Sequence, residues 1–309
     1  MRFNVRDFLP HVYSNRPVLS TKEKPIAGFT LTSRGGFPDD AATIMSVWIA
    51  IILGIVEGLT EFLPVSSTGH LILVGYALNF TGEEAASFEI VIQLGAILSV
   101  VVYFRRRLWD LLLQLAVSRV NQRLALALTI AFVPAAIIGL ALHKWIERHL
   151  FGPVTVAWAL IAGGVVILLV EHYIGRTGRP QTKGLDQIDL GQAWWVGIAQ
   201  CFSLFPGVSR SGATIIGGLL SGMDRTTATE FSFLLAIPTM LAATGYKIVK
   251  DHEVLLQGDP LLLPLSLAVS FVTGLAVVAG FLAFVRSHTF KPFAYYRIVL
   301  GVIILALMH

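Results

Sequence analysis

The chain has 309 residues, of which 55% are hydrophobic and only 14% charged, and its net charge is +4. A soluble domain needs more charge than this to cover its surface, so the mean hydropathy of +0.74 indicates a membrane protein. The single cysteine, Cys201, excludes an intrachain disulfide and a thiolate cluster for zinc or iron–sulfur. We expect the membrane as surroundings and no nucleic acid as partner.

The first 44 residues differ from the rest of the chain. They are polar, hold several Pro and Gly, and lack the apolar core of a signal peptide. We expect residues 1–44 to be a disordered extension, or an artefact of a start codon placed before the real beginning at Met45. Residues 45–309 then form a single integral membrane domain, because no soluble block interrupts their apolar segments.

Six segments are apolar and long enough to cross the hydrocarbon core, which takes about 20 residues. They cover residues 87–104, 124–142, 154–172, 228–248, 261–285 and 293–308. Arginines and lysines gather in three connections, around 105–123, 176–183 and 286–297, with Arg297 in the last. The positive-inside rule assigns these connections to the cytoplasm and both ends to the outside. The fold class predicted is an all-α polytopic membrane protein with six transmembrane helices.

Two further apolar stretches, 46–80 and 192–222, are broken in the middle by Pro, Gly and hydroxyl residues. Each fits two half-helices joined by a loop better than one spanning helix. Unpaired backbone at membrane depth is tolerated only where protein or a water-filled cavity satisfies it. We therefore predict two re-entrant helical hairpins.

The two hairpins are copies of each other. A shift of 143 positions without a gap aligns identical residues, among them Gly54/Gly197, Phe62/Phe205, Val65/Val208, Ser66/Ser209, Gly69/Gly212 and Phe88/Phe231. The repeats run from about 46 to 142 and from about 190 to 285, and the predicted topology inverts one relative to the other. Inverted repeats place their broken helices together near the membrane midplane, so the two loops should meet.

The first loop carries two carboxylates one helical turn apart, Glu57 and Glu61. Ionised groups at this depth are costly and usually functional. Like charges so close need a cation between them, or one must bind a proton. They suit either a divalent cation or a general base. The alternative is a structural hydrogen-bonded pair.

The same loop continues with hydroxyl residues and a histidine, namely Ser66, Ser67, Thr68 and His70. Hydroxyls at a helix start are often simple N-caps. The same arrangement also directs free N–H groups and the positive end of the helix dipole at an anion. His70 has the chemistry for proton transfer near neutral pH, or for a structural hydrogen bond.

The second loop places Arg210 between Ser209 and Ser211, with Thr214 one turn further on. A fixed guanidinium ringed by hydroxyls fits phosphate oxygens. The alternative is a salt bridge that only neutralises Glu57 or Glu61. Acids, an arginine, a histidine and hydroxyls within a membrane match phosphoryl transfer on a lipid with a phosphorylated head.

Three further polar residues, Glu89, Gln93 and Glu230, lie on the helices that follow the two hairpins. They point to the same site more weakly, because each is also compatible with an ordinary hydrogen bond between helices.

The motifs EGLTEFLPVSSTGH (57–70) and PGVSRSGATI (206–215) together resemble the undecaprenyl-diphosphatase, or bacitracin-resistance, family of bacterial inner-membrane enzymes. The resemblance covers Met45 to the C-terminus. It implies hydrolysis of undecaprenyl diphosphate to undecaprenyl phosphate and phosphate, which recycles the lipid carrier for peptidoglycan synthesis and confers bacitracin resistance. It also implies a divalent cation, Mg²⁺ or Ca²⁺, and a site open to the periplasm.

The resemblance carries over to ten positions in this sequence. Catalysis would use Glu57, Glu61, Ser67, His70 and Arg210, with Glu57 and Glu61 as metal ligands, and substrate binding would use Ser66, Thr68, Ser209, Ser211 and Thr214. The nucleophile stays open between Ser66, Ser67, Thr68 and a water. A homodimer is compatible with the sequence.

Two rivals use similar residues. A secondary transporter or lipid-phosphate flippase would also have inverted repeats and broken helices. A lipid phosphatase of the phosphatidic-acid type would need a histidine six residues after its arginine, where Ile216 stands here. Phosphate release by the pure protein separates an enzyme from a transporter.

Overall fold

The computed structural model describes residues 39–78, 80, 83–150, 152–177, 181–257 and 261–307. This part of the chain is all-α, and its only β-type pairing is an isolated bridge between Thr182 and Met223. The α-helices are α1 Asp39–Thr60, α2 Ser67–Ala77, α3 Glu83–Tyr103, α4 Arg105–Leu113, α5 Arg119–His149, α6 Pro153–Thr177, α7 Leu190–Cys201, α8 Arg210–Leu220, α9 Arg225–Gln257, α10 Leu262–Val285 and α11 Lys291–Leu307. Two short 3-10 turns, Leu185–Gln187 and Phe202–Leu204, flank α7.

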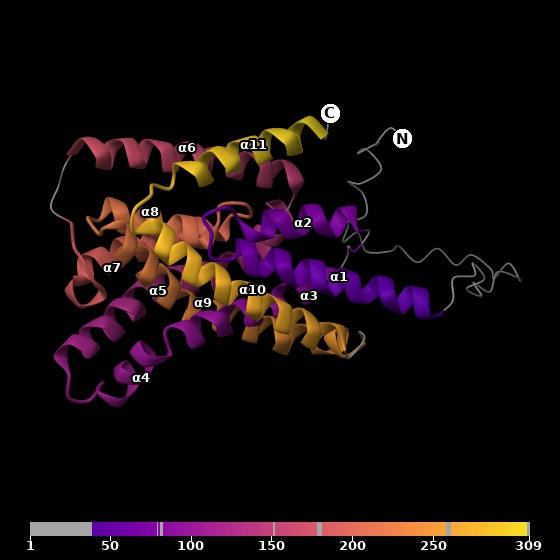
Figure 1. Ribbon diagram of the computed structural model, residues 1–309, viewed down its shortest axis with the longest axis horizontal. Helices are drawn as coiled ribbons and strands as arrows, with labels where there is room; N and C mark the ends of the chain where they lie inside the picture. The colour runs from indigo at the N-terminus through magenta and orange to yellow at the C-terminus, as the bar shows by residue number, and fades with distance from the viewer. Residues whose placement is uncertain are drawn as a thin grey trace, which may run out of the picture.

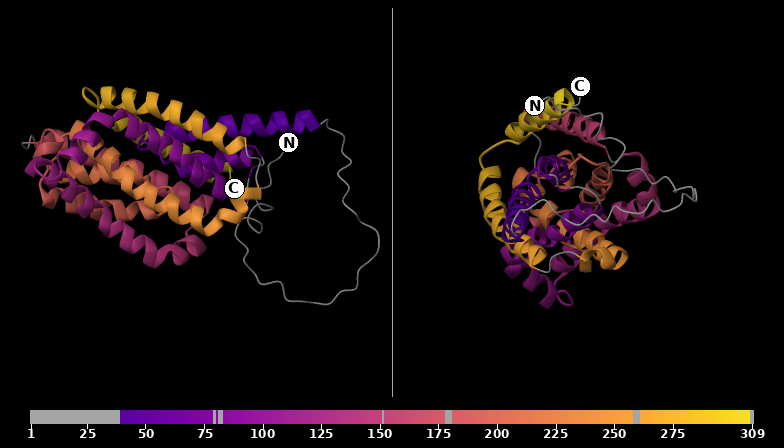
Figure 2. Two further views of the ribbon diagram at one scale, coloured as in Figure 1. Left: turned by 90° about the horizontal axis from the view of Figure 1, so that it is seen from below. Right: turned by 90° about the vertical axis from the view of Figure 1, so that its right-hand side faces the viewer.

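The prediction of an all-helical, multi-pass membrane protein is confirmed. Four helices are long and apolar enough to cross a bilayer: residues 119–142 of α5, α6, residues 225–250 of α9, and α10. A fifth candidate is α3 taken together with α4, from which it is bent by 72°. Each of the six predicted spans falls on a helix, but α11 has only 17 residues. Figure 2 shows these helices running along the long axis of the molecule.

The two apolar stretches with polar centres are broken helices, as predicted. The first forms α1 and α2, which pack on each other across the loop 61–66, and the second forms α7 and α8. Each break carries a proline, Pro64 or Pro206, which has no N–H to continue the helical bonding and disfavours a helical residue before it. Figure 1 shows the two hairpins extending from opposite ends of the molecule toward its middle.

The predicted boundaries differ from the structure in two places. α1 begins at Asp39, inside the segment 1–44 that we expected to be disordered, and the rest of that segment lies outside the described residues. The connection 105–123 contains the helix α4, which was not predicted. Three consecutive arginines at its start lower its mean hydropathy and conceal its apolar positions.

The helices pack in symmetry-related pairs. α1 packs along α10 and α7 packs along α5, so the first helix of each repeat lies against the last helix of the other. The repeat-related glycines make these contacts close, because a Cβ on Gly54 would meet the Ser266 carbonyl oxygen at 2.7 Å and one on Gly197 the Ala131 oxygen at 2.9 Å. The repeats thus interlock, and this interlocking brings their loops together.

A third pair, α6 and α11, extends the symmetry beyond the predicted repeat and lies along one side of the molecule (Figure 1). A Cβ on Gly164 would lie 2.7 Å from the Ala294 carbonyl oxygen, and a Cβ on Gly301 would lie 2.7 Å from the Ala157 oxygen. The offset is the same in both halves, since 301 − 164 and 294 − 157 both equal 137. The two helices therefore cross through equivalent small residues, as helices in membranes often do.

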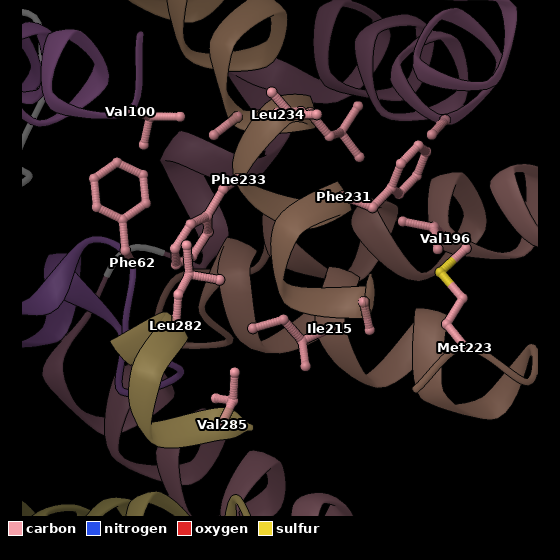
Figure 3. Close-up of a cluster of buried hydrophobic side chains, with 14 of the residues drawn as sticks. Phe62, Val100, Val196, Ile215, Met223, Phe231, Phe233, Leu234, Leu282 and Val285 are labelled. Atoms are coloured by element: carbon pink, nitrogen blue, oxygen red, sulfur yellow. The ribbon is translucent and has the colours of Figure 1, made fainter. Parts of the chain in front are cut away.

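The loop of the first hairpin is anchored in the main apolar core. Phe62 is fully buried and meets the Phe233 ring of α9 edge-on, with 5.1 Å between the ring centroids. Figure 3 shows these two rings facing each other, with Leu282 of α10 beside them. Buried aromatic pairs of this kind stabilise beyond their burial by about 0.5–1.5 kcal/mol, so they help to fix the position of the loop.

Replacing Gly301 by alanine tests the crossing of α6 and α11. The new methyl group would lie 2.7 Å from the Ala157 carbonyl oxygen, so the helices must separate. Overpacking of this kind costs about 1–3 kcal/mol, and we expect a lower thermal unfolding midpoint in detergent. Gly280→Ala is the matched control, because a Cβ there has nothing within 4 Å. Equal midpoints for both variants would contradict the close crossing.

Candidate active site

The two loops meet in the middle of the molecule, as the repeat predicted. Ser211 at the start of α8 donates a hydrogen bond of 2.8 Å to the Leu63 carbonyl oxygen in the first loop. Arg210 Nη2 lies 3.0 Å from Glu61 Oε1, and the side chains of both residues are almost fully buried. The bonds join residues about 150 positions apart, so the site exists only when the repeats are assembled.

The loops also have the same backbone geometry. Ser66 and Ser209 occupy equivalent repeat positions and have φ of 73° and 72°, the only positive φ values among the non-glycine residues that the structure describes. Each hydroxyl accepts a hydrogen bond from the N–H three residues on, Gly69 in one loop and Gly212 in the other. Both serines are therefore N-caps, a role that was given above as an alternative for the hydroxyls of the first loop.

Arg297 holds the two loops together. The residue is 1% exposed, and its guanidinium donates five hydrogen bonds to backbone carbonyls. The acceptors are Pro64 in the first loop, Gly207 and Val208 in the second, and Ala159 and Leu160 of α6. Pro64 and Gly207 are equivalent under the shift of 143, so Arg297 joins corresponding carbonyls of the two repeats.

Arg297 was counted with the charges of a cytoplasmic connection, although it falls within the predicted span 293–308. It lies within α11 and is fully enclosed. Room for its side chain comes from Gly163, where a Cβ would lie 2.2 Å from Nη2. One signal in the sequence could have identified Arg297, because it is followed by the unbroken apolar run 298–308. A charged residue within a membrane helix usually has a functional role.

A serine, a carboxylate and the arginine form the centre of the site. Ser67 Oγ, at the first position of α2, donates a hydrogen bond of 2.5 Å to Glu61 Oε2, while Arg210 binds Oε1. The expected alternative, a salt bridge between Arg210 and a glutamate, is thus present. Arg210 also donates from Nη1 to the Ser232 carbonyl oxygen at 3.1 Å, so the guanidinium is held from two sides.

Two groups in this site lack a partner. The Glu57 carboxylate is fully buried, and neither of its oxygens has a hydrogen bond. Nε of Arg210 is also buried and unpartnered, and these three atoms are among only four such side-chain atoms in the described residues. Leaving a buried charge unpaired is expensive, which makes these groups candidates for ligand binding.

The second repeat shows what a structural group at the Glu57 position does. Gln200 is its repeat equivalent and is equally buried. Its amide donates to the Ala131 carbonyl oxygen at 3.3 Å and accepts from the Thr239 hydroxyl at 3.3 Å. The Gln200 amide is satisfied by protein, whereas the two oxygens of Glu57 in the first repeat are not.

The hydroxyls of Ser211 and Thr214 form hydrogen bonds within the protein. Ser211 and Thr214 are fully buried, and Thr214 Oγ1 lies 2.6 Å from Ser232 Oγ and 2.9 Å from the Arg210 carbonyl oxygen. These contacts fix the start of α8 and therefore the direction of Arg210. Thr68 is half buried in the first turn of α2, next to Ser67.

His70 lies on α2 with both ring nitrogens in hydrogen bonds. Nδ1 is 2.7 Å from the Ser66 carbonyl oxygen, and Nε2 is 2.6 Å from the Tyr296 hydroxyl, whose ring stacks on the imidazole. A carbonyl only accepts, so Nδ1 carries a proton and Nε2 is the nitrogen directed at Tyr296. No sequence pattern indicates the contact with Tyr296, which is 226 positions away.

Of the three weaker candidates, Glu89 and Gln93 lie near the site and Glu230 lies elsewhere. Glu89 of α3 interacts electrostatically with Glu57, so a third carboxylate belongs to the surroundings of the site, and Gln93 is half buried one turn further on. Glu230 instead has Arg107, Asp224 and Arg286 as its charged neighbours. Among the described residues, no three His, Cys, Asp or Glu side chains are grouped to hold a metal ion.

Comparison with known proteins decides the family. Residues 50–303 match the family model described as Bacitracin resistance protein BacA. The chain belongs to this family. A protein named undecaprenyl-diphosphatase from Caldanaerobacter subterraneus subsp. tengcongensis is 50% identical over 84% of this chain and 95% of its own length. Proteins of the same name from Methylobacillus flagellatus and Cupriavidus metallidurans are 51% and 47% identical, each over 83% of this chain and over 96% and 93% of their own lengths. The resemblance seen in the two motifs is confirmed.

Replacing Arg297 by methionine tests its role in holding the loops. Methionine has similar length but no donor, so five carbonyls lose a hydrogen bond, and the three in the loops have no helical partner to replace it. Each lost bond costs about 1 kcal/mol or more. We expect a large fall in unfolding free energy and faster hydrogen exchange at Ser66 and Ser209, measured by mass spectrometry in detergent.

Arg286→Met is the matched control, because Arg286 is an exposed arginine just after α10. It should change neither measurement. Protection of both loops in the Arg297→Met protein equal to that in the control would show that the loops are held by other contacts.

Proposed function

We propose that this chain is an undecaprenyl-diphosphatase, which hydrolyses undecaprenyl diphosphate to undecaprenyl phosphate and inorganic phosphate. The family and relatives of that name about 50% identical over most of the chain support the activity. Release of the monophosphate recycles the lipid carrier for cell-wall synthesis. The name of the family also connects the activity with bacitracin resistance.

The observation that carries the proposal is the pattern of unsatisfied groups. A buried carboxyl group without a partner, Glu57, must bind either a cation or a proton, and a buried donor without a partner, Arg210 Nε, needs an anion. A diphosphate bound to a divalent cation supplies both at once. A neutral ligand would leave the Glu57 charge unpaired, and a simple anion would be repelled by it.

Glu57 and Glu61 are the residues that would hold the divalent cation, Mg²⁺ or Ca²⁺. Glu57 fits this role because both of its oxygens are free, whereas Glu61 already accepts from Ser67 and Arg210. Two protein carboxylates are few for an all-protein site but usual for Mg²⁺ held partly by substrate phosphates and water. When bound, the cation would neutralise the charge that develops on the phosphate oxygens.

Ser67 is the hydroxyl best placed to attack. It lies at the start of α2, where the helix dipole favours a negative phosphate, and its proton already points at Glu61. Oγ would form a bond to the terminal phosphorus as the bond to the bridging oxygen breaks, so undecaprenyl phosphate leaves and Glu61 takes the serine proton. A water would then hydrolyse the phosphoserine and release phosphate.

The other predicted residues have supporting roles in this proposal. Arg210 binds the phosphate oxygens, while Ser66 and Ser209 shape the helix starts and Ser211 and Thr214 hold Arg210 in place. Thr68 adds a hydroxyl beside Ser67, and attack by Ser66, Thr68 or a water remains the alternative. His70 would pass protons between the site and Tyr296.

The proposed setting is the bacterial inner membrane, with six spans, two re-entrant hairpins and a site open to the periplasm. Support comes from the apolar helices, the opposed hairpins and the distribution of arginines. All residues of the proposed site come from one chain, so the activity does not require a homodimer. A homodimer remains part of the proposal only as an oligomeric state.

Loss of Glu61 or Arg210 should abolish the activity. In detergent, purified Glu61→Gln and Arg210→Ala proteins should release phosphate from undecaprenyl diphosphate at least about 100-fold more slowly than the parent. Glu230→Gln is the control, since it removes a carboxylate of the same helix bundle whose charged neighbours are Arg107, Asp224 and Arg286. Folded Glu61→Gln protein with the parent rate would refute the site, and a parent protein that releases no phosphate would favour the transporter.

Glu57 should determine the need for a metal. Glu57→Gln removes a proposed ligand and keeps the shape of the side chain, so half-maximal activity should need at least about ten-fold more Mg²⁺ or Ca²⁺, as for lost metal-site groups generally. Titration after chelator treatment measures this. An unchanged metal requirement in Glu57→Gln, or full activity of the parent in chelator, would remove the metal from the proposal.

Ser67→Ala distinguishes the two kinds of nucleophile. If Ser67 attacks, this variant should lose activity at least about 100-fold, and the parent quenched in acid during turnover should contain phosphoserine at Ser67 by mass spectrometry. A Ser67→Ala protein with more than about a tenth of the parent rate would assign the attack to a water or to a neighbouring hydroxyl.

A further inference from the structure

The unpredicted helix α4 leaves the helix bundle at a steep angle. It follows α3 directly at Phe104 and is bent from it by 72°. The first three residues of α4 are Arg105, Arg106 and Arg107, and arginines are too costly at the bilayer centre for α4 to continue the span. A helix that turns by 72° at the end of a span runs close to parallel to the membrane surface.

The sides of α4 differ in character. Leu108 and Leu111 pack against the main core, so they attach the helix to the bundle. Trp109, Leu112 and Leu113 instead are 63%, 66% and 66% exposed. An exposed tryptophan beside exposed leucines is unusual on a surface facing water but typical of the membrane interface.

Charge at this end of the molecule is strongly positive. The exposed basic side chains are Arg105 and Arg106 of α4 and Arg119 and Arg123 at the start of α5, and the exposed acid among them is Asp110. Arg107 is paired with Asp186 and therefore already neutralised. The surface formed by Arg105, Arg106, Trp109, Leu112 and Leu113 is called the α4 surface below.

We propose that the α4 surface binds anionic phospholipid. Trp109, Leu112 and Leu113 enter the boundary between headgroups and acyl chains, while Arg105 and Arg106 contact headgroup phosphates. Arg105 and Arg106 lie one turn before Trp109 and two turns before Leu113 on the same side of α4, so headgroup phosphates and acyl chains can contact neighbouring parts of one surface. Each arginine near an anionic surface contributes an attraction of about 1 kcal/mol. The surface lies at the end of α3, so the lipid is distinct from the substrate proposed above.

Quenching of Trp109 fluorescence by brominated lipid tests the proposal. The full chain is reconstituted in phosphatidylcholine vesicles that contain a minor fraction of brominated phosphatidylglycerol or, in parallel, brominated phosphatidylcholine. The signal of Trp109 is the difference between the parent and Trp109→Phe. We expect stronger quenching by the brominated phosphatidylglycerol, and a smaller difference between the two lipids at high salt.

Arg105→Gln and Arg106→Gln should each reduce the preference of Trp109 for phosphatidylglycerol about five-fold, the factor that corresponds to about 1 kcal/mol. Trp158 provides the matched control, because it is 59% exposed on the apolar part of α6, with apolar neighbours in sequence. Its signal, obtained with Trp158→Phe, should respond equally to both lipids and to neither arginine replacement.

Two results would overturn the proposal. Equal quenching of Trp109 by both lipids would show that α4 lies in the interface without recognising anionic lipid. No quenching by either lipid would show that Trp109 faces water or is covered by protein, such as a second copy of the chain. Phosphate release is measured on the same vesicles, so failure of the lipid proposal and failure of the enzymatic proposal are distinguishable.

Discussion

The fold depends on how backbone groups are satisfied where two helices are broken inside the bundle. Each break leaves carbonyl oxygens without a helical partner, and in a membrane no bulk water is available to bind them. Arg297 supplies the missing donors to Pro64 in one loop and to Gly207 and Val208 in the other. One side chain therefore stabilises both breaks and fixes the distance between them.

The symmetry of the scaffold contrasts with the asymmetry of its charges. Corresponding residues give the loops the same backbone, since Ser66 and Ser209 share their φ and their capping bond. Chemistry arises where the copies differ: Glu57 stands where the second repeat has Gln200, and Ser67 where it has Arg210. The first repeat contributes two carboxyl groups and a hydroxyl, and the second contributes the guanidinium of Arg210. Two loops of identical sequence could not offer this combination of acidic and basic side chains to one substrate.

The same contrast applies to the outer pair of helices. Arg297 of α11 corresponds to Leu160 of α6 at the offset of 137 that also relates Gly301 to Gly164. The leucine packs in an apolar cluster, while the arginine turns inward to both loops. The buried arginine is therefore present in α11 and not in α6, and the absence of a side chain at Gly163 leaves the space for it.

Much of the architecture could be predicted because the repeat and the hydrophobic pattern are local features of the sequence. Pro64 and Pro206 marked the breaks, and the shift of 143 placed the loops together. The functions of single hydroxyls could not be predicted, because Ser66 and Ser67 are adjacent and differ only in which group they face. Arg297 and α4 were missed for a common reason: arginines at the edge of an apolar run were counted as loop charges. Burial and direction of a side chain depend on partners far away in sequence.

One active site is assembled from both repeats, with Glu61 and Arg210 in direct contact. A double-mutant cycle of Glu61→Gln and Arg210→Gln, read as kcat/KM for phosphate release from undecaprenyl diphosphate, tests it most directly. Residues in one network should be coupled, so the double variant should be more active than the product of the two single losses predicts, by at least about 1 kcal/mol. Losses that multiply, with a coupling energy of zero, would show that the two residues act independently and would contradict a shared site.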